Sequence, residues 1–287
     1  MTWVVTGGAG YIGAHVVRAL QGAGMDVAVV DDLSTGFVDF VPADVPLLRA
    51  DVGDVGQVAA FLTRVGAAGV VHVAGYKFAG ESVREPLHTY RVNVRGTLGV
   101  LEAMERAGVP AIVFSSSAAV YGTPDVERVT EATATAPESP YGESKLIGEW
   151  LLADQGRATG LRHTSLRYFN VVGSADPALS DTSPHNLFPL VFRALDRGER
   201  PRLHLQRVEE LVEPAPGGGS RPPVDDDAAV IVDPALPRHQ RDPLGVVAER
   251  VGRVEEDLGR HVLVGSLVRP GRGEDDARRD IRGDRDP

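Results

Sequence analysis

A glycine-rich turn constrains the fold of this chain more than any other feature. It joins the apolar run WVV (3–5) to an amphipathic run that begins at residue 11. Gly7, Gly10 and Gly13 recur at intervals of three, and Gly8, Gly10 and Gly13 also match the pattern G-x-G-x-x-G. A Cβ in such a turn would block the tight bend, the approach of a phosphate or the packing of helix on strand. The pattern predicts a strand, a phosphate-binding turn and a helix whose N-terminus faces the phosphates.

An acidic pair follows the second apolar run. Asp31 lies eighteen residues after Gly13, directly behind DVAVV (26–30), and Asp32 is next to it. A carboxylate at this place can accept hydrogen bonds from both ribose hydroxyls and repels a 2′-phosphate, so the sequence favours NAD over NADP. A solvated acidic turn is the alternative interpretation. Asp51, which ends the following strand, is either a second cofactor ligand or a helix cap.

Short β-rich runs alternate with runs of helical period up to about residue 200. We expect strands near 3–6, 26–30, 47–50, 69–74, 111–116 and 163–169. We expect long helices over 86–107 and 141–159, closed by Gly108 and Gly160. The alternation predicts an α/β fold, a doubly wound parallel sheet covered by helices that forms an NAD-binding Rossmann domain over residues 1–170. A smaller substrate region would begin at 171–203.

The composition changes abruptly after about residue 203. Every Phe, Trp and Tyr of the chain lies at or before Phe192, and residues 204–287 contain no Lys and no Met. They are rich in Arg, Asp, Gly and Pro, a composition that buries little surface. Only 244–258 and 261–268 resemble a helix and a strand. We therefore expect a loosely structured, incomplete substrate region, and translation in a different reading frame or a rearranged gene is the alternative.

Composition also excludes several classes of function. The net charge of −10 offers no general attraction for nucleic acid or an anionic membrane, and no apolar run is long enough to span a bilayer. The chain has no cysteine and no HExxH-like spacing of histidines, so we expect no metal site. No signal segment precedes the first strand, and we expect a cytoplasmic protein that binds a small molecule.

Lysine is scarce, and both lysines fall in segments that resemble parts of a site. Lys77 and Lys145 are the only lysines among thirty basic residues. Lys145 follows Tyr141 by four residues in YGESK, so the two side chains share one face of a helix. A neighbouring ammonium lowers the pKa of a tyrosine and makes its phenolate a usable general base. The spacing is common in helices, so its weight here comes from the dinucleotide turn and the rarity of lysine.

Three serines end the strand AIVFSSS (111–117). Ligands of a doubly wound sheet collect at the carboxyl ends of its strands, which would place Ser115 to Ser117 beside Tyr141. A serine there can hydrogen-bond a substrate hydroxyl and relay its proton, although serine-rich strand ends are often plain turns. No G-x-S-x-G elbow occurs, so a hydrolase has little support.

Six ordered motifs, TGGAGYIG, DDLSTG, AGYKFAGESV, SSSAAVYG, YGESK and RYFNVVG, resemble the extended short-chain dehydrogenase/reductase family, and the likeness continues to about residue 202. It implies NAD-dependent 4-epimerisation of a UDP-hexose through a 4-keto intermediate, with Tyr141 as base, Lys145 lowering its pKa and Ser117 assisting. The implied cofactor contacts are Gly7, Gly10, Tyr11, Ile12, Gly13, Asp31, Asp32, Thr35, Gly36, Asp51, Val52, Ala74, Gly75, Lys77, Asn93, Ser115, Tyr141, Lys145 and Phe169. The implied substrate contacts are Ser117, Tyr141, Asn170, Asn186 and Leu187.

The resemblance leaves alternatives. Related 4,6-dehydratases need an additional acid and base after the serine strand end, where this chain has Ala118 and Ala119. A non-catalytic NAD-binding protein of the same fold, or an enzyme acting on another nucleotide sugar, is also compatible with the divergent C-terminal part. The family pairs through two long helices, which implies a homodimer through 86–107 and 141–159.

Overall fold

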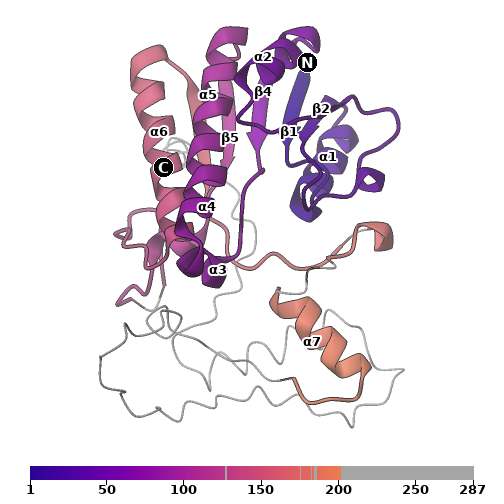
Figure 1. The fold of residues 1–287 in the computed structure, drawn as a ribbon, viewed down its shortest axis with the longest axis vertical. Helices are drawn as coiled ribbons and strands as arrows, with labels where there is room; N and C mark the ends of the chain where they lie inside the picture. The colour runs from indigo at the N-terminus through magenta and orange to yellow at the C-terminus, as the bar shows by residue number, and fades with distance from the viewer. Residues whose placement is uncertain (127, 175, 182, 184–185, 202–287) are drawn as a thin grey trace, which may run out of the picture.

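The computed structural model describes residues 1–201 except 127, 175, 182 and 184–185 (Figure 1). The predicted helix over 244–258, the predicted strand over 261–268 and the rest of the expected tail lie outside the described residues. The strands are β1 (Thr2–Thr6), β2 (Asp26–Asp31), β3 (Leu47–Arg49), β4 (Ala67–His72), β5 (Ala111–Ser115) and β6 (Arg162–Leu166). They form one six-stranded sheet of order β3-β2-β1-β4-β5-β6 in which all neighbours are parallel. The predicted doubly wound sheet is confirmed.

Seven α-helices are described. They are α1 (Tyr11–Gly22), α2 (Val55–Arg64), α3 (Ala79–Arg84), α4 (Pro86–Tyr90), α5 (Gly96–Ala107), α6 (Pro140–Thr159) and α7 (Leu187–Asp196). Shorter 3-10 helices are η1 (Val38–Phe40), η3 (Ala118–Tyr121) and η4 (Pro177–Leu179). Figure 1 shows α7 apart from the other helices, below the edge of the sheet toward which β4 points.

The core lies mainly on one face of the sheet. Helices α2, α5 and α6 cover the face that carries Val4, Val70 and Ile112, and their buried side chains include Phe61 and Met104. On the opposite face α1 packs Val17 against Val5 and Val29. Helix α1 contacts β1 and β2 on that second face, and Leu47 of β3 and Val71 of β4 pack against the same cluster.

The helix predicted over 86–107 is interrupted. Its first turn is α4, its last three turns are α5, and Arg91–Arg95 between them forms a π-helix. A π-helical turn shifts the side-chain direction and is often found at functional sites. Here it turns Asn93, which is 4% exposed, toward the loop behind β4.

Helix α6 begins and ends as its sequence predicts. Ser139 caps its first turn by accepting a hydrogen bond from the N–H of Gly142, and Pro140 follows the cap. Gly160 ends it in the left-handed conformation (φ 76°). This frame fixes the rotation of Tyr141 and Lys145 about the helix axis. Of the described helices, none combines the length and apolar character that crossing a membrane requires.

Candidate active site

The glycine turn is closed too tightly to admit side chains. A Cβ on Gly13 would lie 2.0 Å from the carbonyl oxygen of Gly7, and one on Gly7 would lie 2.7 Å from the backbone nitrogen of Ala74. Gly7 also has a positive φ of 70°. Gly10 is the N-cap of α1 and has no side chain to satisfy the first turn, so the N–H groups of that turn are left for a ligand.

Asp31 lies beside this turn at the end of β2. It is 7% exposed, and its two carboxylate oxygens accept the N–H groups of Ala9 and Leu33, each at 2.9 Å. Burial raises the pKa of Asp31, and the two N–H donors oppose that shift. Leu33 is held in a left-handed conformation (φ 62°), which is rare for a residue with a side chain and is typical of functional loops.

The other acidic residues that were expected at the cofactor form hydrogen bonds within their own loops. Asp32 accepts the N–H and the hydroxyl of Ser34 in its own turn. Asp51 accepts the N–H of Gly53 at 2.7 Å, while Asp54 provides the cap of α2. The loop that contains Thr35 and Gly36 packs on the glycine turn, since a Cβ on Gly36 would lie 2.9 Å from that of Ala9.

Asn93 joins the loop after β4 to helix α6. Its side chain accepts the N–H of Tyr76 at 2.7 Å and donates to the carbonyl of Tyr76 and to the hydroxyl of Ser144. A Cβ on Gly75 would lie 3.0 Å from the Asn93 Oδ1 and 3.4 Å from the Lys145 Nζ. The predicted residues Ala74, Gly75, Asn93 and Lys145 are thus brought together, with Gly99 of α5 packed on the backbone behind Val52.

The three serines after β5 point to three different partners. The hydroxyl of Ser115 bonds to the phenol of Tyr168, that of Ser116 donates to Glu149 at 2.5 Å, and that of Ser117 accepts the N–H of Ala119. Ser117 is also close enough to the Tyr141 phenol to lower the pKa of that phenol through a hydrogen bond. The predicted proximity of Ser117 and Tyr141 is present.

Lys145 is buried and holds the end of β5. Its ammonium donates to the carbonyl of Ser115 at 2.9 Å and lies 5.2 Å from the ring centre of Phe114 and 5.8 Å from that of Tyr141. Burial lowers the pKa of Lys145 to about 8. Burial raises the pKa of Tyr141, the hydrogen bond with Ser117 opposes that rise, and the charge of Tyr168 adds to it. That Lys145 lowers this pKa stays a prediction.

Two polar groups of side chains were not predicted from the sequence. His72, at the end of β4, bridges the hydroxyls of Thr6 and Thr97, and burial lowers its pKa to about 3. Glu149, one turn after Lys145, forms an ion pair with Arg167, whose Nε and Nη2 reach its two oxygens at 2.9 and 2.6 Å. The spacing from Lys145 to Glu149 was visible in the sequence, but the partner across the fold was not.

The remaining predicted residues lie farther from this cluster or on other surfaces. Tyr11 donates its phenol to the carbonyl of Gly173, beside the loop that contains Ser174. Lys77 is exposed, with its ammonium 5.7 Å from the ring centre of Phe78. Asn170 is exposed, and Asn186 donates to Asp181 at the start of α7. Ile12 is the second residue of α1, Phe169 follows Tyr168, and Leu187 is the first residue of α7. All three are partly buried.

The arrangement fits a dinucleotide. A pyrophosphate requires a cradle without side chains and a helix N-terminus whose N–H groups have no side-chain cap. An adenosine ribose requires a carboxylate at the end of the next strand. The Tyr141, Lys145 and Ser117 cluster lies at the same carboxyl edge of the sheet, on β5 and α6. In the part of the chain that the structure describes, no group of three or more metal-ligating side chains occurs.

Comparison with known proteins finds relatives over the described region. The model of the "NAD dependent epimerase/dehydratase family" matches residues 3–219. The UDP-glucose 4-epimerase of Azospirillum brasilense is 47% identical over 175 residues, which are 61% of this chain and 50% of that protein. The enzyme of the same name from Lactobacillus helveticus is 41% identical over 202 residues, which are 69% of this chain and 61% of that protein.

Solved structures give the same relationship. UDP-glucose 4-epimerase of Thermus thermophilus in complex with NAD superposes with a TM-score of 0.64 at 37% identity, over 70% of this chain and 64% of that one. The enzyme of Thermotoga maritima with UDP-glucose gives 0.65 at 33% identity, again over 70% and 64%. The chain thus spans between half and two thirds of the length of these relatives.

The buried Lys145 makes stability depend on pH. Its pKa is 10.5 when unfolded and about 8 when folded, so between these values the unfolded chain binds more protons and the folded state gains stability as pH rises. We expect the unfolding free energy of the wild type, relative to Lys145→Met, to rise by roughly 1–3 kcal/mol from about pH 7 to about pH 10. Denaturant titrations measure it. Lys77→Met, at an exposed lysine, is the control. If the stability difference between wild type and Lys145→Met changed with pH as little as the difference for Lys77→Met, the prediction would be wrong.

Proposed function

This chain belongs to the NAD dependent epimerase/dehydratase family, and on that premise we propose that it binds NAD and interconverts UDP-glucose and UDP-galactose. The observation that carries the proposal is the placement of Ser117, Tyr141 and Lys145 at one edge of the sheet, beside a glycine cradle. The curated relatives that match the same residues are named UDP-glucose 4-epimerases.

The cofactor would lie across the carboxyl edge of the sheet. The first turn of α1 would hold its pyrophosphate and Asp31 its adenosine ribose, with Asn93 and Gly75 shaping the path toward Lys145. When bound, NAD would place a cationic nicotinamide near the phenol, accept a hydride from C4 of the sugar and return it to the opposite face. That cation matters because burial alone raises the pKa of Tyr141.

Tyr141 would move the proton of the reaction. As phenolate it takes the proton of the sugar 4-hydroxyl while the hydride leaves C4, and as phenol it returns the proton to the 4-oxygen after the hydride has returned. Ser117 would hydrogen-bond the 4-oxygen and Lys145 would hold the end of β5 through the carbonyl of Ser115. The sugar nucleotide would extend toward Asn170, Asn186 and Leu187.

The site gives less support to water elimination. Ala118 and Ala119 follow Ser117 and bring no carboxylate. Glu149 lies behind Ser116, but its two oxygens are engaged by Arg167, so it is not a free acid. Hydride return to the same carbon is then the simplest outcome. On this proposal residues 1–170 form the NAD domain and 171–203 begin the sugar-nucleotide region.

The test is conversion of UDP-galactose to UDP-glucose by purified protein supplied with NAD. Tyr141→Phe keeps the ring and removes the proton carrier, so we expect its rate to fall by about 10²- to 10⁴-fold while NAD binding persists. Tyr90→Phe, which loses only a phenol bonded to Glu143, should stay within a few-fold of wild type. Protein that binds NAD but forms no UDP-glucose would contradict the proposal and favour a non-catalytic binding protein.

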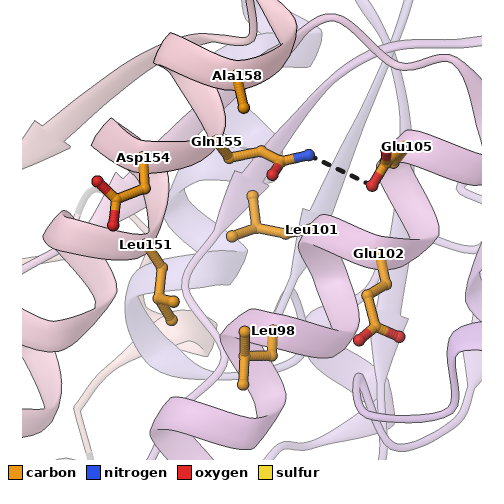
Figure 2. A pocket seen from close by; sticks show the side chains of 8 residues that line it. All are labelled: Leu98, Leu101, Glu102, Glu105, Leu151, Asp154, Gln155 and Ala158. Carbon is orange, nitrogen blue, oxygen red and sulfur yellow. Dashed lines mark hydrogen bonds between the residues drawn. The ribbon is translucent and has the colours of Figure 1, made fainter.

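We further propose that two copies associate through α5 and α6. Figure 2 shows the hollow between these helices, which Leu101 of α5 and Leu151 of α6 line and across which Gln155 donates to Glu105. Leu98, at the rim, is 39% exposed, and Trp150 on the same helix pair is 58% exposed. Side chains of this kind are stabilised when a second apolar surface covers them.

Sedimentation of the purified chain tests this association. We expect a dimer for the wild type and a monomer for Leu98→Glu. In the variant, association would bury a carboxylate without a partner between the two copies, which is unfavourable. Val38→Glu places the same charge on another exposed apolar position, in η1, and should leave the dimer intact. A monomeric wild type, or a dimeric Leu98→Glu, would contradict the proposed interface.

A further inference from the structure

We propose that the Glu149–Arg167 ion pair, acting through Ser116, is a positioning device for the reaction centre. It would fix the backbone that presents Ser117 to Tyr141. This inference rests on the proposed function, because it concerns the same phenol and the same strand end. It assigns a role to side chains that the proposed chemistry leaves unused.

The first observation is that regular strand pairing stops just before the reaction centre. The last pair between β5 and β6 joins Ser115 to Leu166. The next backbone contact between the two segments is the hydrogen bond from the N–H of Ala118 to the carbonyl of Tyr168. Ser116, Ser117 and Arg167 fall within this gap. The backbone hydrogen bonds of Ser116 and Ser117 are local, since the N–H of Ser116 donates to the carbonyl of Phe114 and the carbonyl of Ser117 accepts the N–H of Val120. Side chains add the contacts that join this segment to Arg167.

The second observation is a chain of hydrogen bonds across that gap. Ser116, which is 1% exposed, donates its hydroxyl to Oε1 of Glu149 at 2.5 Å. The same carboxylate accepts Nε and Nη2 of Arg167, and Nη1 of Arg167 donates to the phenol of Tyr121 at 3.1 Å. The guanidinium also lies 5.1 Å from the ring centre of Tyr121. One carboxylate thus ties β5, η3, α6 and the segment after β6 together.

The burial of this pair argues for geometry rather than stability as its purpose. The side chains of Glu149 and Arg167 are only 11% and 23% exposed. In a partly buried pair the loss of hydration offsets much of the attraction, so the net gain in stability of the fold is small. A two-pronged arginine–carboxylate contact does, however, fix direction as well as distance. The hydrogen bonds that Arg167 donates to Glu149 raise the pKa of Arg167 further, which keeps the guanidinium charged.

The consequence concerns the residue next to Ser116. With the hydroxyl of Ser116 directed to Glu149, the backbone presents Ser117 toward Tyr141, where its hydrogen bond opposes the raising of the Tyr141 pKa by burial. Arg167 directly precedes Tyr168, whose phenol bonds to Ser115 and which also faces Tyr141. Loss of the hydrogen bond between Ser116 and Glu149 would leave the residues in place. It would make the geometry of the hydrogen bond between Ser117 and the Tyr141 phenol less well defined.

Ser116→Ala is the primary variant because it removes the anchor without changing any charge. The groups around Tyr141 that titrate or carry charge are Lys145 on α6, Tyr168 after β6, and Glu143, which binds Tyr90 of α4. His72 of β4 interacts with Lys145 and stays neutral because burial lowers its pKa to about 3. On α3, Glu81 forms an ion pair with Arg84, and Glu85 adds its charge near Tyr76. None of these groups is altered by the variant.

Two readouts are needed. The first is the pKa of Tyr141, taken from the ultraviolet absorbance of tyrosinate as the difference between each protein and its Tyr141→Phe counterpart. We expect Ser116→Ala to raise that pKa, because the Ser117 contact is weakened. The second is kinetic: kcat should fall about tenfold or more, with KM for UDP-galactose within about twofold, since misplacement acts on the reacting geometry. Thr63→Ala removes a hydroxyl hydrogen bond of α2 and serves as the control.

A double-mutant cycle tests whether Glu149 acts through Ser116. Glu149→Gln alone should lower kcat, and adding Ser116→Ala should lower it no further, because both changes break one chain of contacts. Losses that multiply, or an unchanged Tyr141 pKa in Ser116→Ala, would overturn the proposal. If the wild type forms no UDP-glucose, the proposed function fails, and the tyrosinate titration alone then decides the positioning role.

Discussion

The contact between Gly13 and the carbonyl of Gly7 is the constraint on which the rest of the site depends. There is no room for a Cβ between them, so α1 starts directly above the turn and its first N–H groups face the edge of the sheet. The same turn places the N–H of Ala9 on Asp31 and lets the backbone of Gly7 approach Ala74. The ends of β1, β2 and β4 are brought together by this packing.

A second constraint is the burial of polar groups behind the reaction centre. Lys145, His72 and Asn93 are each nearly inaccessible, and each has hydrogen-bond partners on other elements. Among the described residues no buried side-chain nitrogen or oxygen lacks a partner. Such networks specify geometry because any shift leaves a group unpaired in a medium of low dielectric. The phenol of Tyr141 lies beside this network, and burial raises its pKa.

The sequence predicted those parts of the molecule that depend on local rules. The parallel sheet followed from the alternation of β-rich and helical runs, the end of α6 from Gly160, and the cradle from its glycines. The proximity of Ser117 and Tyr141 followed from the rule that ligands gather at strand ends. These predictions required only spacing along the chain.

What the sequence did not predict depends on contacts between distant segments. The π-helical turn brings Asn93 to the backbone of Tyr76, and the partner of Glu149 lies eighteen residues further along the chain. Asp32 and Asp51 also accept hydrogen bonds within their own turns, and their contact with the cofactor stays a prediction. The burial that raises the pKa of Tyr141 depends on the packing of distant segments and cannot be read from a four-residue spacing.

The most direct test of the account is the equilibrium binding of NAD, measured by calorimetry on the full chain. The account predicts that the wild type binds NAD. It also predicts that Gly13→Ala loses binding, because the added Cβ would lie 2.0 Å from the carbonyl oxygen of Gly7 and force the turn open. Gly22→Ala, at a position where a Cβ meets nothing within 4 Å, should bind as the wild type does. A wild type that does not bind NAD, or a Gly13→Ala variant that binds it unchanged, would contradict the central claim.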